Sequence, residues 1–280
     1  MTPGNGHRVT VAVPVYRSRL TPEEEISWRH LSHFLGHRDV RLFLPEGLES
    51  PLPGARQERF PARYFDSVRT YSRLLLSEAF YRRFEAAEYL LIYQLDALVF
   101  SDRLEPWCEA GYDYLGAPWW KDPKRPERGF ARVGNGGLSL RRVEACLEVL
   151  TSTTRPGWGL LAGSVAPDLD TAGGLARWRR KGRVLREARR GARWYAEHYS
   201  LNEDRFWSDR AHLLHPSFST APPREALAFS FEVAPEECYR RNRSRLPFGC
   251  HGWWRYGREF WQPHLLPRGS SSAAAEEAAS

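Results

Sequence analysis

The sequence predicts an α/β fold in which helices flank a mostly parallel central sheet. A β-branched run at 9–13, a helix-forming segment and a second apolar run at 40–44 follow one another with β-α-β spacing. Residues 89–93 form a near-continuous apolar run, typical of a central strand covered on both faces. The chain has 280 residues, of which 42% are hydrophobic and 27% charged, an ordinary globular composition. We therefore expect one domain with a core of normal size.

The segment between the first two strands carries clear helix signals. Thr21 can cap the helix, Pro22 suits its first position, and Glu24 completes a capping box. Gly36 is expected to end the helix near Leu35.

The remaining elements are predicted in chain order. An apolar face at helical spacing predicts a helix over 67–84; it consists of Val68, Tyr71, Leu74, Leu75, Ala79 and Phe80. After the central strand we expect an extended segment at 113–118, helices at 142–150 and 202–212, and a short strand at 228–232.

Composition predicts how the chain is organised. We expect residues 1–265 to form the single domain, with a Gly/Pro-rich and basic insertion at 151–195. Residues 266–280 are small, polar and low in complexity, so we expect them to be a disordered tail.

Positive charge is concentrated in one segment. The chain has 41 Lys and Arg against 34 Asp and Glu, a net charge of +7, and residues 177–193 contribute nine basic residues and one Glu. This segment could contact a phosphate-rich ligand, an anionic membrane surface or nucleic acid, or be a solvated helix. Only Trp178 and Trp194 flank it, without the regular aromatic spacing that base stacking needs, so we expect no nucleic-acid partner.

Several protein classes are excluded. No apolar stretch approaches the ~20 residues that span a bilayer, and the first residues do not resemble a signal peptide. Cys108, Cys146, Cys238 and Cys250 are scattered, so they are expected to be reduced and mostly buried. Adjacent Cys250 and His251 do not match the ligand spacing of structural zinc sites. We expect a cytoplasmic protein, with peripheral membrane contact through 177–193 as an open option.

Four short motifs carry polar residues suited to chemistry. They are Gln94-Leu95-Asp96, Gly134-Asn135-Gly136-Gly137-Leu138-Ser139-Leu140-Arg141, Asn202-Glu203-Asp204 and Phe248-Gly249-Cys250-His251. Asp96 lies where the apolar central strand ends, and ligands of open α/β sheets bind outside the carboxyl ends of strands. A buried charge there is costly unless it is paired or binds a metal. A turn-capping aspartate explains the position equally well.

The order of these motifs along one chain resembles the core of GT-A glycosyltransferases. Those enzymes carry a D-x-D motif after a central strand, a glycine-rich loop, an x-E-D motif at a helix start and a C-terminal metal-binding histidine. More narrowly, YLLIYQLDALVF, DYLGAPW, VGNGGLSLR, NEDRFW and FGCHGWW are similar to the bacterial DUF5672 group, whose members are expected to be glycosyltransferases. The resemblance spans residues 9–254. It implies a GT-A-like, Rossmann-like fold and sugar transfer from a nucleotide-sugar donor to a glycan, lipid-linked or small-molecule acceptor.

The resemblance also implies a cation. Asp96 matches the last residue of D-x-D and His251 the metal-binding histidine, so these two would hold a divalent ion. An oxygen and an imidazole suit Mn²⁺ better than Mg²⁺. Gln94 departs from the pattern because it replaces the first acid; its amide could bind ribose or a metal-bound water.

By the same resemblance, Asp204 would be the general base of an inverting reaction, with Glu203 as its alternative. The structural explanation is that both carboxylates favour a helix start and that Asn202 caps it. The other residues expected at the donor site are Pro14, Val15 and Tyr16 beside the nucleotide base and Gly136 and Gly137 along the donor sugar. Arg69 and Arg73, one helical turn apart, could reach a phosphate or form a solvated face. The two glycines could instead serve a turn that needs positive φ.

Two other functions remain open. A catalytically inactive module that binds a sugar nucleotide or glycan is favoured by Gln94 and opposed by Asp96, Asp204 and His251. A nucleic-acid-binding protein would depend on residues 177–193 and would lose affinity steeply with salt.

Overall fold

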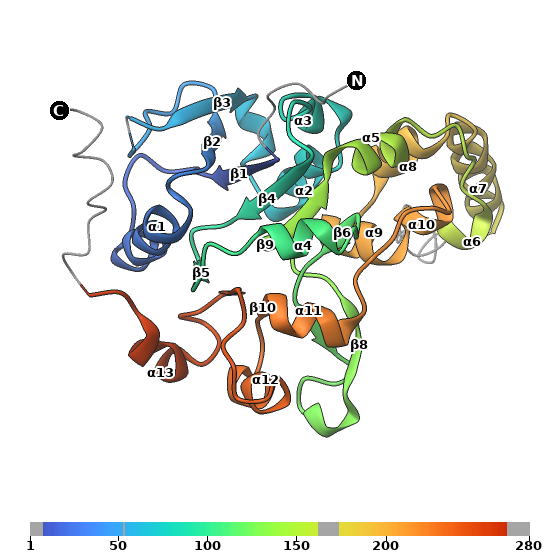
Figure 1. The fold of residues 1–280 in the computed structure, drawn as a ribbon. Coiled ribbons are helices and arrows are strands. Elements are labelled where there is room, and N and C mark those ends of the chain that lie inside the picture. The colour runs from blue at the N-terminus through green and yellow to red at the C-terminus, as the bar shows by residue number, and fades with distance from the viewer. Residues whose placement is uncertain (1–7, 53, 162–173, 268–280) are drawn as a thin grey trace, which may run out of the picture.

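The computed structural model describes residues 8–52, 54–161 and 174–267, which contain a six-stranded sheet flanked by helices (Figure 1). Four strands are parallel and lie in the order β3-β2-β1-β4. Their bounds are β1 Val9–Pro14, β2 Asp39–Pro45, β3 Arg56–Phe60 and β4 Tyr89–Tyr93. Beyond β4 comes β9 (Leu138–Arg142), which is antiparallel both to β4 and to the edge strand β6 (Tyr114–Leu115). The α/β fold is therefore confirmed, with a mixed sheet.

The strand order creates a switch point between β1 and β4. Helix α1 (Pro22–Leu35) leads from β1 outward to β2, whereas α2 (Val68–Leu75) and α3 (Glu78–Arg82) lead from β3 back across to β4. Right-handed crossovers in opposite directions place these helices on opposite sides of the sheet, as Figure 1 shows for α1 and α3. Ligands of such sheets bind outside the carboxyl ends of the two strands where the direction reverses.

Helix α1 has the predicted ends. The Thr21 hydroxyl accepts a hydrogen bond from the Glu24 amide at 3.2 Å, and the Glu24 carboxylate accepts one from the Thr21 amide at 2.8 Å. This is the expected capping box, and the helix ends at Leu35.

The helix predicted over 67–84 is wrong as a single helix. It breaks at Ser77, whose hydroxyl accepts a hydrogen bond from the Phe80 amide and begins α3 as a new cap. Val68, at the start of α2, is 67% exposed, and Ala79 of α3 is also exposed, so neither belongs to the buried apolar face.

A second, smaller sheet brings the C-terminal third of the chain to β4. It has the order β10-β11-β5, with bounds β5 Ala97–Val99, β10 Ser230–Phe231 and β11 Gly249–His251. Strand β11 is antiparallel to β5, and this register pairs His251 with Ala97. The strand predicted at 228–232 is wrong in its first half, because α11 (Pro223–Phe229) extends through Phe229.

The other elements follow the predicted order in shorter pieces. The extended segment at 113–118 divides into β6 and β7 (Pro118–Trp120), and β7 pairs with β8 (Phe130–Val133). The remaining helices are α4 (Glu105–Glu109), α5 (Val143–Thr151), α6 (Trp158–Leu161), α7 (Gly174–Ala188), α8 (Ala192–His198), α9 (Glu203–Asp209), α10 (Ala211–Leu214), α12 (Pro235–Arg241) and α13 (Arg258–Trp261). The short 3₁₀ turns are Ala62–Tyr64, Pro126–Arg128 and Gln262–His264.

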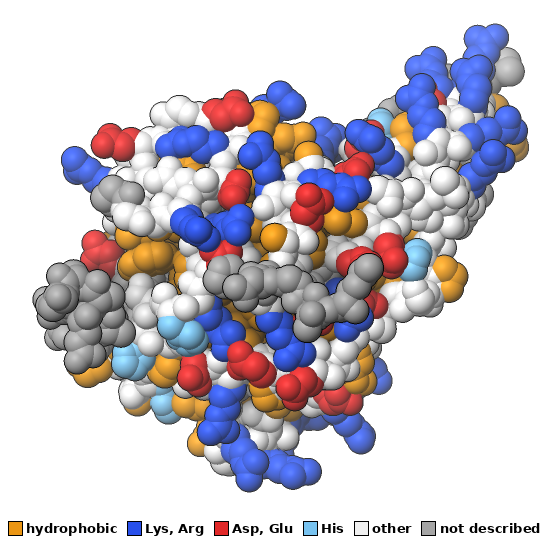
Figure 2. All heavy atoms as spheres, turned by 45° about the horizontal axis from the view of Figure 1, so that its top comes forward, with side chains coloured by type: hydrophobic (Ala, Val, Ile, Leu, Met, Phe, Trp, Pro, Cys, Tyr) orange, Lys and Arg blue, Asp and Glu red, His pale blue; other side chains and the backbone are white. Residues whose placement is uncertain are grey.

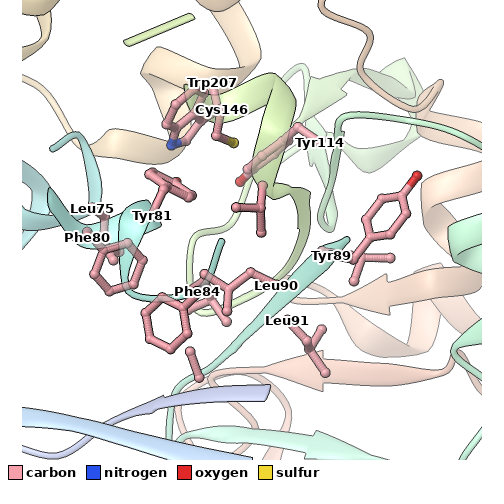
Figure 3. Close-up of a cluster of buried hydrophobic side chains, with 14 of the residues drawn as sticks. Leu75, Phe80, Tyr81, Phe84, Tyr89, Leu90, Leu91, Tyr114, Cys146 and Trp207 are labelled. Carbon is pink, nitrogen blue, oxygen red and sulfur yellow. The ribbon is translucent and has the colours of Figure 1, made fainter. Parts of the chain in front are cut away.

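The main core packs against β4, all of whose residues are buried (Figure 3). Aromatic rings fill much of it; Tyr81 and Trp207 meet edge to face, with 5.6 Å between their ring centroids. All four cysteines are free and buried, as expected.

The predicted insertion at 151–195 contributes to this core at its C-terminal end, where Ala192, Trp194 and Tyr195 of α8 are buried. Of the predicted disordered tail, residues 268–280 lie outside the described ranges, and the Leu266 amide donates a hydrogen bond to His30. Within the described ranges, no helix is both long enough and apolar enough to traverse a lipid bilayer.

Candidate active site

A cleft of about 540 Å³ lies at the switch point of the sheet. The ends of β1 and β4, the loop before β9, the start of α9 and the segment after β11 line it. The predicted site residues found in it are Pro14, Val15, Tyr16, Gln94, Asp96, Gly136, Gly137, Asp204 and His251. Asp96, Asp204 and His251, which are far apart in the sequence, thus share one cavity.

Asp96 lies in the turn between β4 and β5, and only 5% of it is exposed. Its Oδ1 lies 3.0 Å from His251 Nε2, and its Oδ2 lies 2.8 Å from Arg255 Nη2. Burial disfavours the ionised carboxylate, but the cationic neighbours outweigh burial and lower the pKa of Asp96 below its usual value. Neither oxygen has a well-aligned hydrogen bond in the described part of the chain.

His251 is held in the cleft by carboxylates on both sides of its ring. Its Nδ1 lies 3.1 Å from Glu232 Oε1, and its Nε2 also lies 3.3 Å from Gln94 Oε1. Burial opposes the protonated ring, but Asp96 and Glu232 outweigh it and raise the pKa of His251 to about 10. The imidazole therefore carries a charge that compensates the buried carboxylates.

These residues have a donor set that fits a divalent cation. Asp96 offers an oxygen, and His251 offers a nitrogen once Nε2 gives up its proton, so a bound cation would replace that proton; the two Asp96 oxygens lack aligned hydrogen-bond donors. Because Glu232 occupies the Nδ1 side, Nε2 is the nitrogen that faces Asp96, an arrangement common around metal-binding histidines. Across the described ranges, no group of three or more His, Cys, Asp or Glu side chains is placed to hold a metal ion. A cation here would have to be shared with an anionic ligand.

The glycine-rich loop packs closely against two side chains from other elements, His251 and Glu203. A Cβ on Gly137 would lie 2.1 Å from His251 Nε2, and a Cβ on Gly136 would lie 2.0 Å from Glu203 Oε1. Positive φ occurs at Asn135 (70°) and at neither of these glycines. The glycines are therefore required for close approach, and the turn explanation for them is wrong.

Asp204 lies in the first turn of α9 and faces the cleft. Its Oδ2 accepts a hydrogen bond from the Asn135 amide at 3.2 Å, and its Oδ1 accepts one from the Arg205 amide at 2.7 Å. Burial, reinforced by the neighbouring Glu203 carboxylate, raises the pKa of Asp204 to about 7. Such a carboxyl can accept a proton near neutral pH. Asn202 occupies the N-cap position, but its side chain makes no capping hydrogen bond.

Glu203 is buried beside the cleft and does not line it. Its Oε1 lies 2.9 Å from Nη2 of the fully buried Arg141, which also donates a hydrogen bond to the Tyr81 hydroxyl at 3.1 Å. Glu203 therefore joins α9 to β9 as part of a buried ion pair.

Arg73 is not brought to this site. Tyr71 of α2 lines the cleft, whereas Arg73 lines a second cleft with Thr70 and Ser77. Two residues along a helix correspond to a rotation of about 200°, so Arg73 faces the opposite side from Tyr71.

Sequence reasoning missed several residues of the cleft. Arg255 and Arg17 line it, and Arg255 follows His251 within the motif HGWWR. Asn135 lay inside the glycine motif without a role; its Nδ2 is buried and has no hydrogen-bond partner in the described ranges. Glu232 gave no signal beyond ending an apolar segment.

Comparisons with known proteins give one family and several distant structures. A family model described as "Protein of unknown function (DUF5672)" matches residues 54–251. No curated protein matches. Galactosyltransferase LgtC, in complex with donor and acceptor sugar analogues, is 12% identical, with 93% of this chain and 98% of that chain covered and a TM-score of 0.45.

Two further structures, a glycosyltransferase and a mannan synthase, are similarly distant. The apo form of GlyE from Streptococcus pneumoniae is 12% identical, covering 94% of this chain and 66% of that one, with a TM-score of 0.42. Core-mannan synthase A from Aspergillus fumigatus, in its Mn/GDP form, is 12% identical, covering 72% and 73%, with a TM-score of 0.37. At such values, a functional assignment has to rest on the chemistry of the cleft.

Proposed function

Because this chain belongs to the DUF5672 family, whose description states no function, we propose its function from the cleft: transfer of a sugar from a nucleotide-sugar donor to an acceptor hydroxyl. One observation carries the proposal. Asp96, Asp204 and His251, which are far apart in the sequence, line one cavity at the switch point of the sheet. These are the residues that carry the resemblance to GT-A glycosyltransferases.

The cleft suits a donor with an aromatic base and a diphosphate. A cavity of about 540 Å³ is of the usual size for such a ligand. Tyr16, 52% exposed at the end of β1, offers a ring for the base. Arg255 and Arg17 supply cationic groups for the phosphates.

Asp96 and His251 would hold a divalent cation together with the donor, and their oxygen and nitrogen atoms favour Mn²⁺ over Mg²⁺. When bound, such an ion would stabilise the negative charge that develops on the leaving diphosphate. Gln94, beside His251, adds a neutral oxygen where the related motif has a carboxylate.

Asp204 is the group proposed to accept the proton of the acceptor. The acceptor oxygen attacks the anomeric carbon and forms the new glycosidic bond. The bond between that carbon and the diphosphate oxygen breaks, and its electron pair leaves with the nucleoside diphosphate. The acceptor proton moves to the Asp204 carboxylate. Attack in a single step on the face opposite the leaving diphosphate gives inversion at the anomeric carbon. With a pKa of about 7, Asp204 is partly ionised at neutral pH.

The experiment combines ligand binding with turnover. A panel of UDP-, GDP- and dTDP-sugars with Mn²⁺ is screened for a rise in melting temperature, and release of the nucleoside diphosphate is then measured with water or added acceptors. We expect at least one donor to stabilise the protein and to be turned over. Asp204→Asn should lower the release rate by at least about 100-fold while the donor-induced melting shift persists.

The other outcomes separate the alternatives. A melting shift without any release, in the wild-type protein and across all acceptors, identifies a catalytically inactive binding module. No shift with any donor, with or without Mn²⁺, overturns the proposal. The matched control is Arg183→Gln on the exposed face of α7, which should leave both readouts unchanged.

A further inference from the structure

Helix α7 (Gly174–Ala188) carries most of the basic segment and lies at the right edge of the molecule in Figure 1. Figure 2 shows a dense group of Lys and Arg side chains on the projecting corner of the surface. None of the residues that line the candidate active site comes from this helix. Its charge therefore needs an explanation other than donor binding.

Three of the arginines of α7 form one stripe. At 100° per residue, Arg179, Arg183 and Arg186 fall within about 60° of each other, and all three are exposed. Val184 and Ala188 lie on the opposite side of the helix and pack against the main core. The helix is thus held by its apolar side and presents its arginines directly outward.

These three arginines form no ion pair in the described part of the chain, although Glu187 lies four residues after Arg183 on the same helix. No ion pair joins Arg179, Arg183 or Arg186 to any described carboxylate, and the adjoining Arg189 and Arg190 are equally unpaired and exposed. Arg193, just beyond, is paired with Glu78 and Glu197. A row of like charges repels itself, so its arrangement points to an external anion.

An exposed aromatic side chain flanks the stripe, about 110° around the helix from its centre. Trp178 is 72% exposed, and the Lys181 ammonium lies 5.2 Å from the centre of its ring. Exposing an indole to water is unfavourable, whereas Trp is enriched where lipid headgroups meet the acyl chains. Basic helices with an exposed Trp bind membrane surfaces through both contributions.

We propose that α7 docks the protein onto an anionic lipid surface. The stripe of Arg179, Arg183 and Arg186 would meet lipid phosphates, and Trp178 would insert at headgroup level. A convex helix that projects from the molecule can meet a flat surface without rearrangement. A lipid surface is favoured over nucleic acid because the helix offers one exposed ring instead of a series for base stacking, and its sequence has no Asn or Gln for reading bases.

The test is co-sedimentation of the full chain with vesicles of phosphatidylcholine alone or with 30% phosphatidylserine. We expect binding only to the anionic vesicles, and weaker binding at higher salt. The triple variant Arg179→Glu, Arg183→Glu, Arg186→Glu should lower the apparent affinity by at least about 100-fold. Trp178→Ala should lower it by a smaller factor and leave the salt dependence unchanged.

A matched control keeps the change in net charge constant. Lys121→Glu, Lys124→Glu and Arg125→Glu alter three exposed basic residues in the loop between β7 and β8 and should retain most of the binding. If the glutamate variant of α7 has a lowered melting temperature, the three arginines are changed to Gln instead, which preserves the length and polarity of the side chains.

Three results overturn the proposal: no sedimentation of the wild-type protein with anionic vesicles, equal loss in the loop variant, or tighter binding to a DNA or RNA oligonucleotide than to the vesicles at the same salt concentration. None of these readouts involves sugar transfer, so the outcome is independent of the proposed function.

Discussion

The candidate active site buries and pairs its charged side chains, whereas helix α7 exposes its arginines without ion-pair partners in the described part of the chain. In the cleft, the carboxylate of Asp96 is buried and has cationic groups of His251 and Arg255 within 3.0 Å. On α7, the arginine stripe is exposed and forms no ion pair with a carboxylate in the described part of the chain. Buried charges depend strongly on their partners, because one left alone has lost its hydration. Exposed charges are screened by water and salt, so each contributes little to stability and remains available to a partner.

The largest effect on stability is expected at the buried pair behind the cleft. Arg141→Met leaves the Glu203 carboxylate buried without its cation, so the free energy of unfolding should fall by about 3 kcal/mol or more. The double variant Arg141→Met, Glu203→Met removes both charges and should recover most of that loss. Urea unfolding curves of the wild type and both variants measure this.

An exposed arginine, Arg183 on α7, provides the reference for the loss of stability at Arg141. Arg183→Met on α7 should change the free energy of unfolding by no more than about 0.5 kcal/mol. If Arg141→Met costs no more than Arg183→Met, burial does not distinguish the two regions as argued.

The second effect concerns Asp204 and depends on pH. Its pKa is about 7 in the folded protein, against about 4 in an unfolded chain. Folding therefore favours the neutral carboxyl; this stabilisation is complete below pH 4 and is lost as the pH rises through 7. Asp204→Asn removes the buried charge and should raise the free energy of unfolding, by about 2–3 kcal/mol more at pH 8.5 than at pH 5.

Denaturant unfolding at the two pH values measures this gain. A carboxylate that served only to cap α9 would behave differently, since the Asn variant would then destabilise the protein at high pH. If Asp204→Asn stabilises the protein and also abolishes turnover, Asp204 behaves as a functional group that the fold holds in an unfavourable environment.

The sequence predicted those parts of the site that depend on local pattern. The apolar run of β4 located Asp96 near the end of a strand. That Asp204 and His251 would share its cavity was implied by the resemblance to GT-A glycosyltransferases, not by local pattern. Arg73 was misplaced although the information was present: Tyr71 and Arg73 differ by 200° around one helix, so they could not face the same cleft.

Other contacts could not be read from the sequence. The pairing of Arg141 with Glu203 joins residues 62 positions apart, and it depends on how α9 docks against β9. Arg255 reaches Asp96 because β11 pairs with β5, a register that no local pattern fixes. Long-range pairing of this kind is decided by packing of the whole core, which propensity and periodicity do not describe.

The last comparison concerns glycines in the two regions. A Cβ on Gly182, within α7, would have no heavy atom within 4 Å, so Gly182→Ala only gains helix propensity. We expect the free energy of unfolding to rise by about 0.5–1 kcal/mol for a cooperative unit that includes α7, measured by urea unfolding followed by circular dichroism. At Gly137 the same change places a Cβ 2.1 Å from His251 Nε2 and must displace the loop or the imidazole. Gly137→Ala should destabilise the protein. If Gly182→Ala did the same, the outer face of α7 would have to be packed against other groups, and the contrast between the tightly packed glycine loop and the exposed helix would be wrong.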